Sequence, residues 1–302
     1  MSTRARLFLI DGSSQMYRAY HAMRGSGLSG PGGKTTHAVY IFVTMLRKLM
    51  QDHDPRYIAA SFDLPGPTFR SDLATDYKAN RSPMPPDLAE QIPWVHEACE
   101  ALGVPILTSQ RYEADDVIGT LAAREPGPIE VATGDRDLFQ VIDDARPVRV
   151  LYTGRGVAKL EVYDNAVVQE RYGVPAASYA DFAALRGDPS DGLPGVNGIG
   201  DKSAARLVTR YGSLAGILAA VTDPAAGFAP GLRTKLVAAA DYLAVAPTVV
   251  RVATGVPLPP LEPALPDAPR NPQRVAELTE RWGLSGSVRR LTEALALTAA
   301  QR

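Results

Sequence analysis

The sequence predicts an α/β fold with a mostly parallel central sheet, followed by a region built from helices. Runs of aliphatic and β-branched residues alternate with helix-like stretches as far as about residue 163, which is typical of right-handed βαβ units. Beyond that point, short helix-like segments separated by glycine or proline replace the strands. The 302 residues are enough for two domains, and we divide the chain into 1–175 and 176–302.

Four segments have the composition of strands. They are Leu7–Asp11, Tyr57–Asp63, Ile129–Thr133 and Val148–Tyr152. Between them, Thr36–Met50 and Asp116–Ala123 repeat apolar residues three and four positions apart, which predicts helices with one apolar face. Residues 257–272 include seven prolines and predict a stiff, extended connection before helix-like spacing resumes at Pro272–Leu297.

Composition excludes several classes of protein. The chain is 45% hydrophobic and 22% charged, which is ordinary globular usage and argues against disordered or fibrous proteins. No apolar run approaches the roughly 18 residues of a membrane span, and no signal-peptide pattern opens the sequence, so we expect a cytoplasmic protein with no membrane partner. The single cysteine, Cys99, cannot form an internal disulfide and is expected to be buried on a helix.

The net charge of −1 hides a separation of charge along the chain. Residues 1–50 sum to +6, residues 51–200 to −11 and residues 201–302 to +4. Such a pattern is consistent with basic surfaces flanking an acidic, cation-binding site, although random surface charge would fit the totals equally well.

Acidic side chains follow three of the predicted strands. Asp11 ends the first, Asp63 ends the second, and Asp135 and Asp137 follow the third. Because the carboxyl ends of parallel strands share one edge, and ligands of open α/β sheets bind outside that edge, we expect these four side chains to converge.

Two further acidic groups have local patterns that also fit structural roles. Glu113, Asp115 and Asp116 open a helix, where acids complement the helix dipole, and Asp188 and Asp191 lie in a turn-like segment. Together the nine carboxylates, with no clustered histidine or cysteine, favour Mg²⁺ or Mn²⁺. Two such ions about 3.5–4 Å apart can bind the attacking and leaving oxygens of a phosphodiester, which predicts phosphoryl-transfer chemistry. An aspartyl-nucleophile phosphatase is disfavoured because Asp11-Gly-Ser lacks a second aspartate two residues on.

Two basic elements suggest a nucleic-acid substrate. Gly195, Gly198 and Gly200 form what we call the glycine hairpin. They precede a helix that carries Lys202 and Arg206 four residues apart, a pattern suited to binding a phosphate backbone. No strand precedes these glycines, so a dinucleotide-binding fingerprint is excluded. The second element is a long insertion after Asp63. It carries Arg70, Tyr77, Lys78 and Arg81. If this stretch is helical, Lys78 and Arg81 share one face and Tyr77 lies one turn from Arg81, although such residues by themselves also fit a solvated charged surface.

The motifs together resemble one family, the 5′-nucleases or flap endonucleases, and in particular the N-terminal nuclease domain of bacterial DNA polymerase I. The resemblance covers about residues 7–290. It is carried by Ile10-Asp-Gly-Ser-Ser with Tyr17-Arg-Ala-Tyr-His21, Phe69-Arg with Tyr77-Lys-Ala-Asn-Arg81 and Pro83-Met-Pro, Glu113-Ala-Asp-Asp-Val-Ile-Gly-Thr-Leu, Thr133-Gly-Asp-Arg-Asp, and Gly187-Asp-Pro-Ser-Asp-Gly-Leu-Pro-Gly-Val-Asn-Gly-Ile-Gly.

The resemblance implies a PIN-like nuclease core in residues 1–175 with a helical arch at about 65–100. It also implies that residues 176–302 comprise a helix-three-turn-helix, which binds duplex DNA and often K⁺, and a C-terminal extension. By the same resemblance, Asp63 and Asp115 hold a first metal ion. Asp11, Glu113 and Asp116 would bind the same ion, either directly or through water molecules. Asp135, Asp137, Asp188 and Asp191 hold a second, and a third ion is left open. Lys78 and Arg81 would contact the scissile phosphate, supported by Arg18 and Arg70.

The implied activity is a metal-dependent 5′→3′ exonuclease and flap endonuclease of bacterial DNA replication and repair, associated with the nucleoid. Its substrates would be 5′ flaps, nicks, 5′ ends or RNA primer–DNA hybrids, and its partners replication or repair factors. Two departures are Gly192, where many members have Asn, and Arg136, where Lys is common. The chain resembles a stand-alone member because no polymerase portion follows. A catalytically weak DNA-junction binding protein is the alternative, and a PIN-type ribonuclease is disfavoured because such domains lack the arch and the glycine hairpin.

Overall fold

The computed structural model describes residues 7–23, 25–53, 55–261 and 264–301. Its centre is a six-stranded sheet in the order β3-β2-β1-β4-β5-β6. The strands are β1 (Leu7–Asp11), β2 (Tyr57–Ser61), β3 (Ile106–Leu107), β4 (Ile129–Thr133), β5 (Val148–Tyr152) and β6 (Glu161–Tyr163). Neighbouring strands are parallel except for β6, which pairs antiparallel with β5. The predicted α/β fold with a mostly parallel sheet is therefore confirmed.

The four predicted strands are present, and two others were not anticipated. β1, β4 and β5 have the predicted bounds, whereas β2 ends at Ser61, two residues before the predicted end at Asp63. The unanticipated strands are β3 and β6, of two and three residues. Such short segments are too brief to display the alternation from which a strand is inferred, and only their neighbours in the sheet define them.

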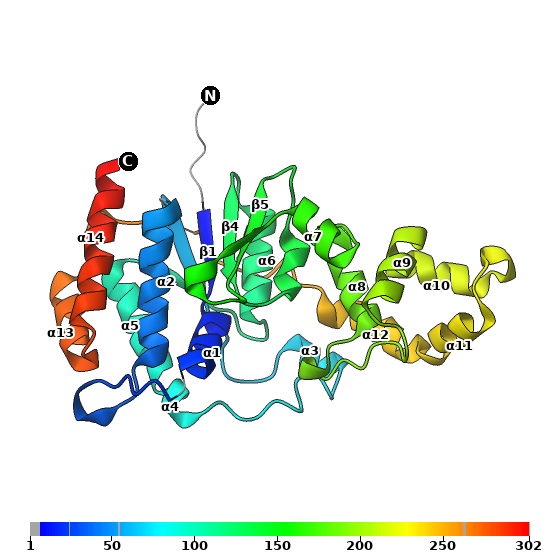
Figure 1. Cartoon of the computed structure of the whole chain (residues 1–302), viewed down its shortest axis with the longest axis horizontal. Helices are drawn as coiled ribbons and strands as arrows, with labels where there is room; N and C mark the ends of the chain where they lie inside the picture. Colours follow the sequence, from blue (N-terminus) through cyan, green and yellow to red (C-terminus); the bar gives the residue numbers. More distant parts are fainter. Residues whose placement is uncertain (1–6, 24, 54, 262–263, 302) are drawn as a thin grey trace.

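Helices cover both faces of the sheet, so side chains of one strand alternate between two cores. Leu7 and Leu9 pack in the cluster that contains α6 (Ala114–Arg124), and Phe8 and Ile10 pack in the cluster beneath α1, α2 and α5. These last helices are α1 (Gly12–Met23), α2 (His37–His53) and α5 (Gln91–Leu102). Figure 1 shows the two layers on opposite sides of β1 and β4. Burial on both faces explains why β1 is apolar throughout until Asp11.

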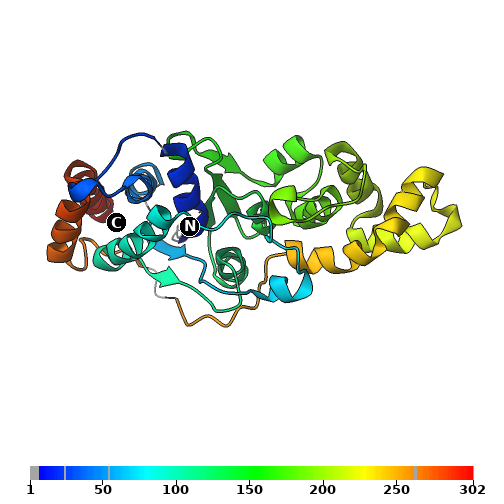
Figure 2. The same ribbon diagram turned by 90° about the horizontal axis from the view of Figure 1, so that it is seen from below.

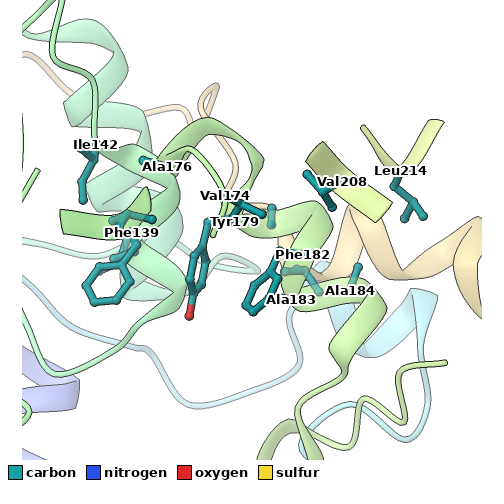
Figure 3. Packing of buried hydrophobic residues seen from close by; sticks show 14 of the residues in the cluster. Phe139, Ile142, Val174, Ala176, Tyr179, Phe182, Ala183, Ala184, Val208 and Leu214 are labelled. Atoms are coloured by element: carbon teal, nitrogen blue, oxygen red, sulfur yellow. The ribbon is translucent and has the colours of Figure 1, made fainter. Parts of the chain in front are cut away.

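The helical region extends away from the sheet as one arm (Figures 1 and 2). It contains α7 (Asn165–Tyr172), α8 (Tyr179–Arg186), α9 (Asp201–Tyr211), α10 (Leu214–Thr222), α11 (Pro230–Ala238) and α12 (Ala240–Val250). Aromatic rings join this arm to the sheet: the ring centroids of Phe139 and Tyr179 are 5.4 Å apart, and those of Tyr179 and Phe182 are 5.6 Å apart. Figure 3 shows these three side chains along the junction. The arm therefore shares one continuous hydrophobic core with the face of the sheet that carries α6.

The last two helices return to the opposite side of the sheet. The predicted helical stretch Pro272–Leu297 is two helices, α13 (Pro272–Trp282) and α14 (Ser285–Gln301), separated where Gly283 has a φ of 66°. Both pack in the cluster with α2 and α5 rather than with α9–α12 (Figure 1). The proline-rich connection before them follows the core, since the N–H of Leu265 donates to the carbonyl of Arg56 at 3.1 Å and that of Asn271 to Ala101 at 2.9 Å.

The segment predicted as a helical arch is helical only in part. It contains α3 (Phe69–Leu73) and α4 (Pro86–Ala89), and residues 74–85 between them form turns and extended chain. Pro83, Pro85 and Pro86 oppose a helix there, and Lys78 has a positive φ of 56°. Residues 91–102 form α5, which belongs to the core. In Figure 1 the stretch from α3 to α4 crosses beneath the carboxyl ends of the strands, and we call residues 64–90 the arch segment.

Short 3₁₀ helices connect the main elements. They are η1 (Pro31–Gly33), η2 (Asp137–Val141), η3 (Val157–Lys159), η4 (Ala176–Ser178), η5 (Pro189–Asp191) and η6 (Pro224–Ala226). No helix within the described ranges is long and apolar enough to cross a membrane.

Candidate active site

The carboxyl ends of β1 and β4 are joined through the side chain of Asp11, the last residue of β1. Its Oδ2 accepts a hydrogen bond from the Thr133 hydroxyl at 2.6 Å, and its Oδ1 accepts one from the N–H of Ser14 at 2.9 Å. The Thr133 hydroxyl in turn accepts from the N–H of Asp135 at 2.9 Å. Thr133 was not among the predicted site residues, although it directly precedes the Gly-Asp-Arg-Asp motif that drew attention to this turn.

Asp63 connects the end of β2 to the start of α6. Its N–H donates to the Ser13 hydroxyl at 2.8 Å, and its Oδ1 accepts from the N–H of Ala114 at 2.7 Å. Ala114 is the first residue of α6, so this contact anchors the turn of the helix that carries Asp115. These two contacts link Asp63 to α1 and to α6, whose N-terminal end carries Glu113, Asp115 and Asp116.

The pKa values of this first group reflect burial among other acids. Burial raises the pKa of Asp11 to about 7, helped by the charges of Asp135 and Asp63 and opposed by its hydrogen bonds. Burial also raises the pKa of Asp115 well above its ordinary value, with Asp11 and Asp135 adding to the effect. These acids are close enough to repel one another when ionised.

A second acidic group lies around η2 and η5. Burial, together with the charges of Asp135, Asp191 and Asp188, raises the pKa of Asp137 to about 8. Asp188 caps η5 by accepting from the N–H of Ser190 at 3.0 Å, and Asp135 accepts from the N–H of Asp137 at 2.9 Å. Asp135 belongs to both groups, because its charge raises the pKa values of Asp11 and Asp115 as well as that of Asp137. The neighbouring Arg136 is exposed.

We call the two groups together the acidic cluster: Asp11, Asp63, Glu113, Asp115, Asp135, Asp137, Asp188 and Asp191. Its chemistry fits a hard divalent cation. Its donors are carboxylate oxygens, and the raised pKa values mean that added positive charge is needed for all of the acids to be ionised near neutral pH. Within the described ranges, no three acidic, histidine or cysteine side chains converge closely enough to enclose an ion. Mg²⁺ does not require such a cage, because it retains several waters and is usually held by one or two carboxylates together with substrate phosphates.

Two of the predicted metal ligands have other partners. Both oxygens of Asp116 bind the guanidinium of Arg70, at 2.7 and 2.6 Å, and the two side chains are 0% and 2% exposed. Arg70 is therefore buried within the protein and does not fit the predicted phosphate contact. Glu113 lies under the arch segment, where its Oε1 accepts from Lys78 at 2.7 Å and its Oε2 from the Tyr77 hydroxyl at 2.9 Å.

The arch segment is docked on the acidic cluster through its basic residues. Besides the contact of Lys78 with Glu113, the N–H of Lys78 donates to the carbonyl of Asp191 at 2.8 Å, and Arg81 forms an ion pair with the Asp191 side chain. Lys78 and Arg81 are not on one helical face as predicted, because this stretch is a turn. Their cationic ends nonetheless lie at the acidic cluster.

Gly192 permits this docking. Its φ is 75°, and a Cβ at this position would lie 2.1 Å from the carbonyl oxygen of Asp76 in the arch segment. The departure noted in the sequence, glycine where asparagine is common, therefore coincides with a close approach of main chain to main chain.

Arg18 is also occupied by protein groups. It donates to the carbonyl of Gly134 at 3.3 Å and to that of Gly154 at 2.8 Å, which ties α1 to the turns after β4 and β5. Its side chain remains exposed beside the cluster.

The glycine hairpin lies on the arm, at the start of α9. Gly195 and Gly198 have φ values of 65° and 71°, and Gly200 caps the helix that presents Lys202 and Arg206 to solvent. Sequence reasoning missed Lys235 of α11: a Cβ added to Gly198 would lie 2.4 Å from its ammonium nitrogen. No motif links the two positions, because α11 is brought over the hairpin only by the fold.

Comparison with known proteins connects these features to one family. Residues 6–173 match the N-terminal resolvase-like domain of 5′–3′ exonucleases, and residues 174–272 match their C-terminal SAM fold. A 5′–3′ exonuclease of Streptomyces coelicolor is 47% identical over 95% of this chain and 99% of its own length. One from Mycobacterium tuberculosis is 43% identical over 97% and 98%.

More distant relatives are larger proteins or share the fold alone. DNA polymerase I of Mycobacterium leprae is 43% identical over 78% of this chain, which spans only 26% of that protein. The T5 D15 protein, co-crystallised with metal ions, has a TM-score of 0.67 at 16% identity, covering 97% of this chain and 99% of its own. The catalytic core of Rad2 in complex with DNA substrate has a TM-score of 0.58 at 18% identity, covering 98% and 93%. With both domain matches and relatives of this identity along nearly its whole length, the chain belongs to the 5′–3′ exonuclease family.

Proposed function

We propose that the protein is a divalent-metal-dependent 5′→3′ exonuclease and flap endonuclease that hydrolyses phosphodiesters at 5′ flaps and 5′ ends of DNA. The observation that carries the proposal is the position of Lys78 and Arg81, two cations on the arch segment, directly over the acidic cluster at the carboxyl edge of the sheet. Cations beside a carboxylate site are arranged to receive a phosphodiester together with metal ions. The family membership supports the same activity.

The acidic cluster would hold two Mg²⁺ or Mn²⁺ ions. Asp11, Asp63 and Asp115 would serve one position, and Asp135, Asp137, Asp188 and Asp191 the other. When bound, such ions activate water and stabilise charge on the leaving oxygen. Asp116 is left out of this set because Arg70 occupies both of its oxygens. A structural neighbour, the T5 5′-exonuclease, has been solved with divalent zinc, which supports a metal requirement.

Lys78 and Arg81 would exchange their protein partners for the scissile phosphate. Burial disfavours the charged Lys78 ammonium, but the charges of Glu113 and Asp191 outweigh it and raise the Lys78 pKa, so the side chain is cationic at physiological pH. Charge accumulates on the phosphoryl oxygens in the transition state, where a positioned ammonium stabilises it more than in the ground state. Tyr77 would orient Lys78 through their shared contact with Glu113.

The arm would bind the duplex part of the substrate. At Gly200 of its glycine hairpin no atom lies within 4 Å of where a Cβ would stand, so a phosphate could approach the main chain there, with Lys202, Arg206 and Lys235 as counter-charges. We also propose that a K⁺ ion binds at the glycine hairpin. The DNA present in structures of Rad2 and of the T5 D15 flap endonuclease supports a DNA substrate.

We place this activity in primer removal and repair beside the nucleoid, on 5′ flaps, nicks and RNA primer–DNA hybrids, together with replication or repair factors. The relatives that are DNA polymerases support this setting. No observation favours the alternative of a catalytically weak junction-binding protein.

The test is cleavage of a duplex carrying a 5′ flap with a label at either end of the flap strand. In Mg²⁺ or Mn²⁺ we expect release of the flap at the junction and a nick that DNA ligase seals, with no cut in EDTA. Matched substrates with a 3′ flap or with a blunt duplex should be cut at least about 10-fold more slowly. Equal cleavage of the 3′ flap would contradict the proposed polarity, and binding without cleavage in either metal would favour the junction-binding alternative.

A further inference from the structure

The buried ion pair between Arg70 and Asp116 lies next to the acidic cluster, and a guanidinium nitrogen of Arg70 is also 3.4 Å from Oε2 of Glu113. All four acceptor positions of the Asp116 carboxylate are used. Oδ1 accepts from Arg70 at 2.7 Å and from the N–H of Ala253 at 2.8 Å, and Oδ2 accepts from Arg70 at 2.6 Å and from the N–H of Glu113 at 2.9 Å. A carboxylate offers about four such positions, so none is left for a metal ion.

The partners of this pair come from three parts of the chain. Arg70 belongs to α3 at the base of the arch segment, and Asp116 to the first turn of α6, next to Asp115. The third part is the stretch 249–256, which includes the C-terminal end of α12, the last helix of the arm, and which we call the strap. Arg70 donates to two strap carbonyls, that of Val249 at 2.7 Å and that of Arg251 at 3.0 Å.

Further contacts fix the strap along the same elements. The Thr120 hydroxyl of α6 donates to the carbonyl of Ala253 at 3.1 Å and accepts from the N–H of Val256 at 3.1 Å. Gln140 of η2 binds the carbonyl of Val250 at 3.1 Å and the N–H of Val252 at 3.0 Å. Two of the elements that carry proposed metal ligands, α6 with Asp115 and η2 with Asp137, are thus bonded to the strap.

We infer that Arg70 and Asp116 are positioning residues that fix the metal-carrying helix α6 relative to the duplex-binding arm. The pair binds no metal and no DNA; it holds the strap, the arch base and the first turn of α6 at one point. DNA held on the arm then presents its scissile phosphate to Asp115 and Lys78 at a set distance. Misplacement of a reacting group by even about 1 Å can cost two orders of magnitude in rate. This inference rests on the proposed function.

The first experiment separates positioning from metal binding. Mn²⁺ is titrated by calorimetry onto DNA-free wild type, Asp116→Asn and, as the matched control, its neighbour variant Asp115→Asn. We expect Asp116→Asn to keep Mn²⁺ affinity within about 3-fold of wild type, whereas Asp115→Asn should weaken it 10-fold or more, because only Asp115 is proposed as a ligand. Equal losses in the two variants would make Asp116 a ligand and overturn the inference. This titration needs no cleavage activity, so its result stands even if the proposed nuclease function fails.

The second experiment asks whether the pair positions α6 or merely supports the fold. Single-turnover cleavage of the 5′-flap duplex is measured at saturating Mg²⁺, at a temperature where each variant is fully folded, for Arg70→Met, Arg70→Lys, Asp116→Asn and the double variant Arg70→Met with Asp116→Asn. We expect the rate to fall 10-fold or more in each single variant, with flap affinity in Ca²⁺ changed less than about 3-fold. The double variant should be no slower than the slower single variant, because both break the same contact.

Hydrogen exchange localises the effect. In Arg70→Met, or in Arg70→Lys if the former fails to fold, the amides of Glu113, Ala253 and the strap should exchange at least about 10-fold faster than in wild type. Arg146→Met is the control, because Arg146 pairs with Asp143 on the surface, outside the strap. The inference would be contradicted if the folded fraction of every variant cleaved the flap at the wild-type rate. It would also be contradicted if amide exchange in the strap were unchanged, because the pair would then only stabilise the fold.

Discussion

The ammonium group of Lys78 lies 2.7 Å from Oε1 of Glu113, so a cation of the arch segment is already seated on the acidic cluster. Glu113 is 9% exposed and has a second arch contact, the Tyr77 hydroxyl at 2.9 Å. The arch segment therefore meets the N-terminal end of α6 through the Glu113 carboxylate as well as through the pair of Arg70 with Asp116. Any phosphate that Lys78 binds must compete with Glu113, which makes the Lys78 contact sensitive to charge brought by metal ions and DNA.

We predict that Lys78→Ala slows catalysis more than it weakens binding. The single-turnover rate on a 5′-flap duplex should fall roughly 10²-fold, which corresponds to about 2.7 kcal/mol of barrier. Flap affinity, measured in Ca²⁺, should change only a few fold because other phosphate contacts remain. Lys48→Ala is the control, since Lys48 pairs with Asp52 on α2. Equal losses of rate and affinity would make Lys78 a ground-state contact, and no loss in either would remove the arch segment from catalysis.

Gly192 gives a second prediction about the arch segment. Gly192→Ala should slow cleavage about 10-fold and destabilise the protein by about 1–3 kcal/mol, because a side chain at positive φ is strained and its Cβ would collide with the Asp76 carbonyl. Gly32→Ala is the matched control, because Gly32 has nearly the same backbone angles, φ 77° and ψ 10° against φ 75° and ψ 14° at Gly192, but no atom lies within 4 Å of its Cβ. Thermal unfolding and single-turnover rates of the two variants separate backbone strain from collision. Identical behaviour of the two would show that docking does not depend on Gly192.

Stability of the metal-free protein should fall as pH rises. Burial raises the pKa values of Asp11 and Asp137 from 3.8 to about 7 and about 8, so the folded protein binds more protons than the unfolded chain between these limits. The protonated forms of these two acids therefore contribute to the free energy of unfolding. This contribution is complete below pH 3.8, the ordinary pKa, and is lost as pH rises through the folded-state pKa values of about 7 and about 8. In EDTA, the Tm between pH 6 and pH 8.5 should therefore decline, by roughly 2–4 °C for each kcal/mol lost.

The variant Asp137→Asn tests whether these acids cause the decline of Tm with pH. Asp137→Asn removes one of the titrating groups and should flatten the decline while leaving the Tm at pH 8 equal or higher. Added Mn²⁺ should raise the Tm of wild type more at pH 8 than at pH 6. A Tm that rises with pH in EDTA, or a variant with a much lower Tm, would mean that these acids stabilise the fold as ionised groups.

Binding of duplex DNA should depend on salt through the arm. Lys202→Ala, Arg206→Ala and Lys235→Ala should each weaken binding to a similar degree on unrelated sequences. Each should also reduce the slope of log affinity against log salt concentration by about one, because a phosphate contact is lost. Lys48→Ala should leave the slope unchanged. A strong effect on one sequence alone would indicate contacts with bases, and an unchanged slope for Lys235→Ala would exclude it from the interface.

The sequence predicted those parts of the molecule that depend on neighbouring residues. The strands that end in Asp11 and precede Asp135 have local apolar patterns, and their parallel order brings the acids to one edge. The role of Asp116 depends on distant groups: Arg70 lies 46 positions away and Ala253 lies 137 positions away. A helix-start acid looks the same in sequence whether it faces a metal ion or a buried arginine. Lys235 likewise has no local motif and reaches Gly198 only through the packing of α11.

The acidic cluster is proposed to perform metal-dependent hydrolysis at the 5′ side of a DNA junction. The most direct measurement is single-turnover cleavage of a 5′-flap duplex by wild type and Asp137→Asn, in Mg²⁺ and in EDTA, beside flap affinity in Ca²⁺. We predict cleavage by wild type in Mg²⁺ only, a rate at least about 10³-fold lower for Asp137→Asn, and flap affinities within a few fold of each other. Undiminished cleavage in EDTA, or by Asp137→Asn, would contradict the account.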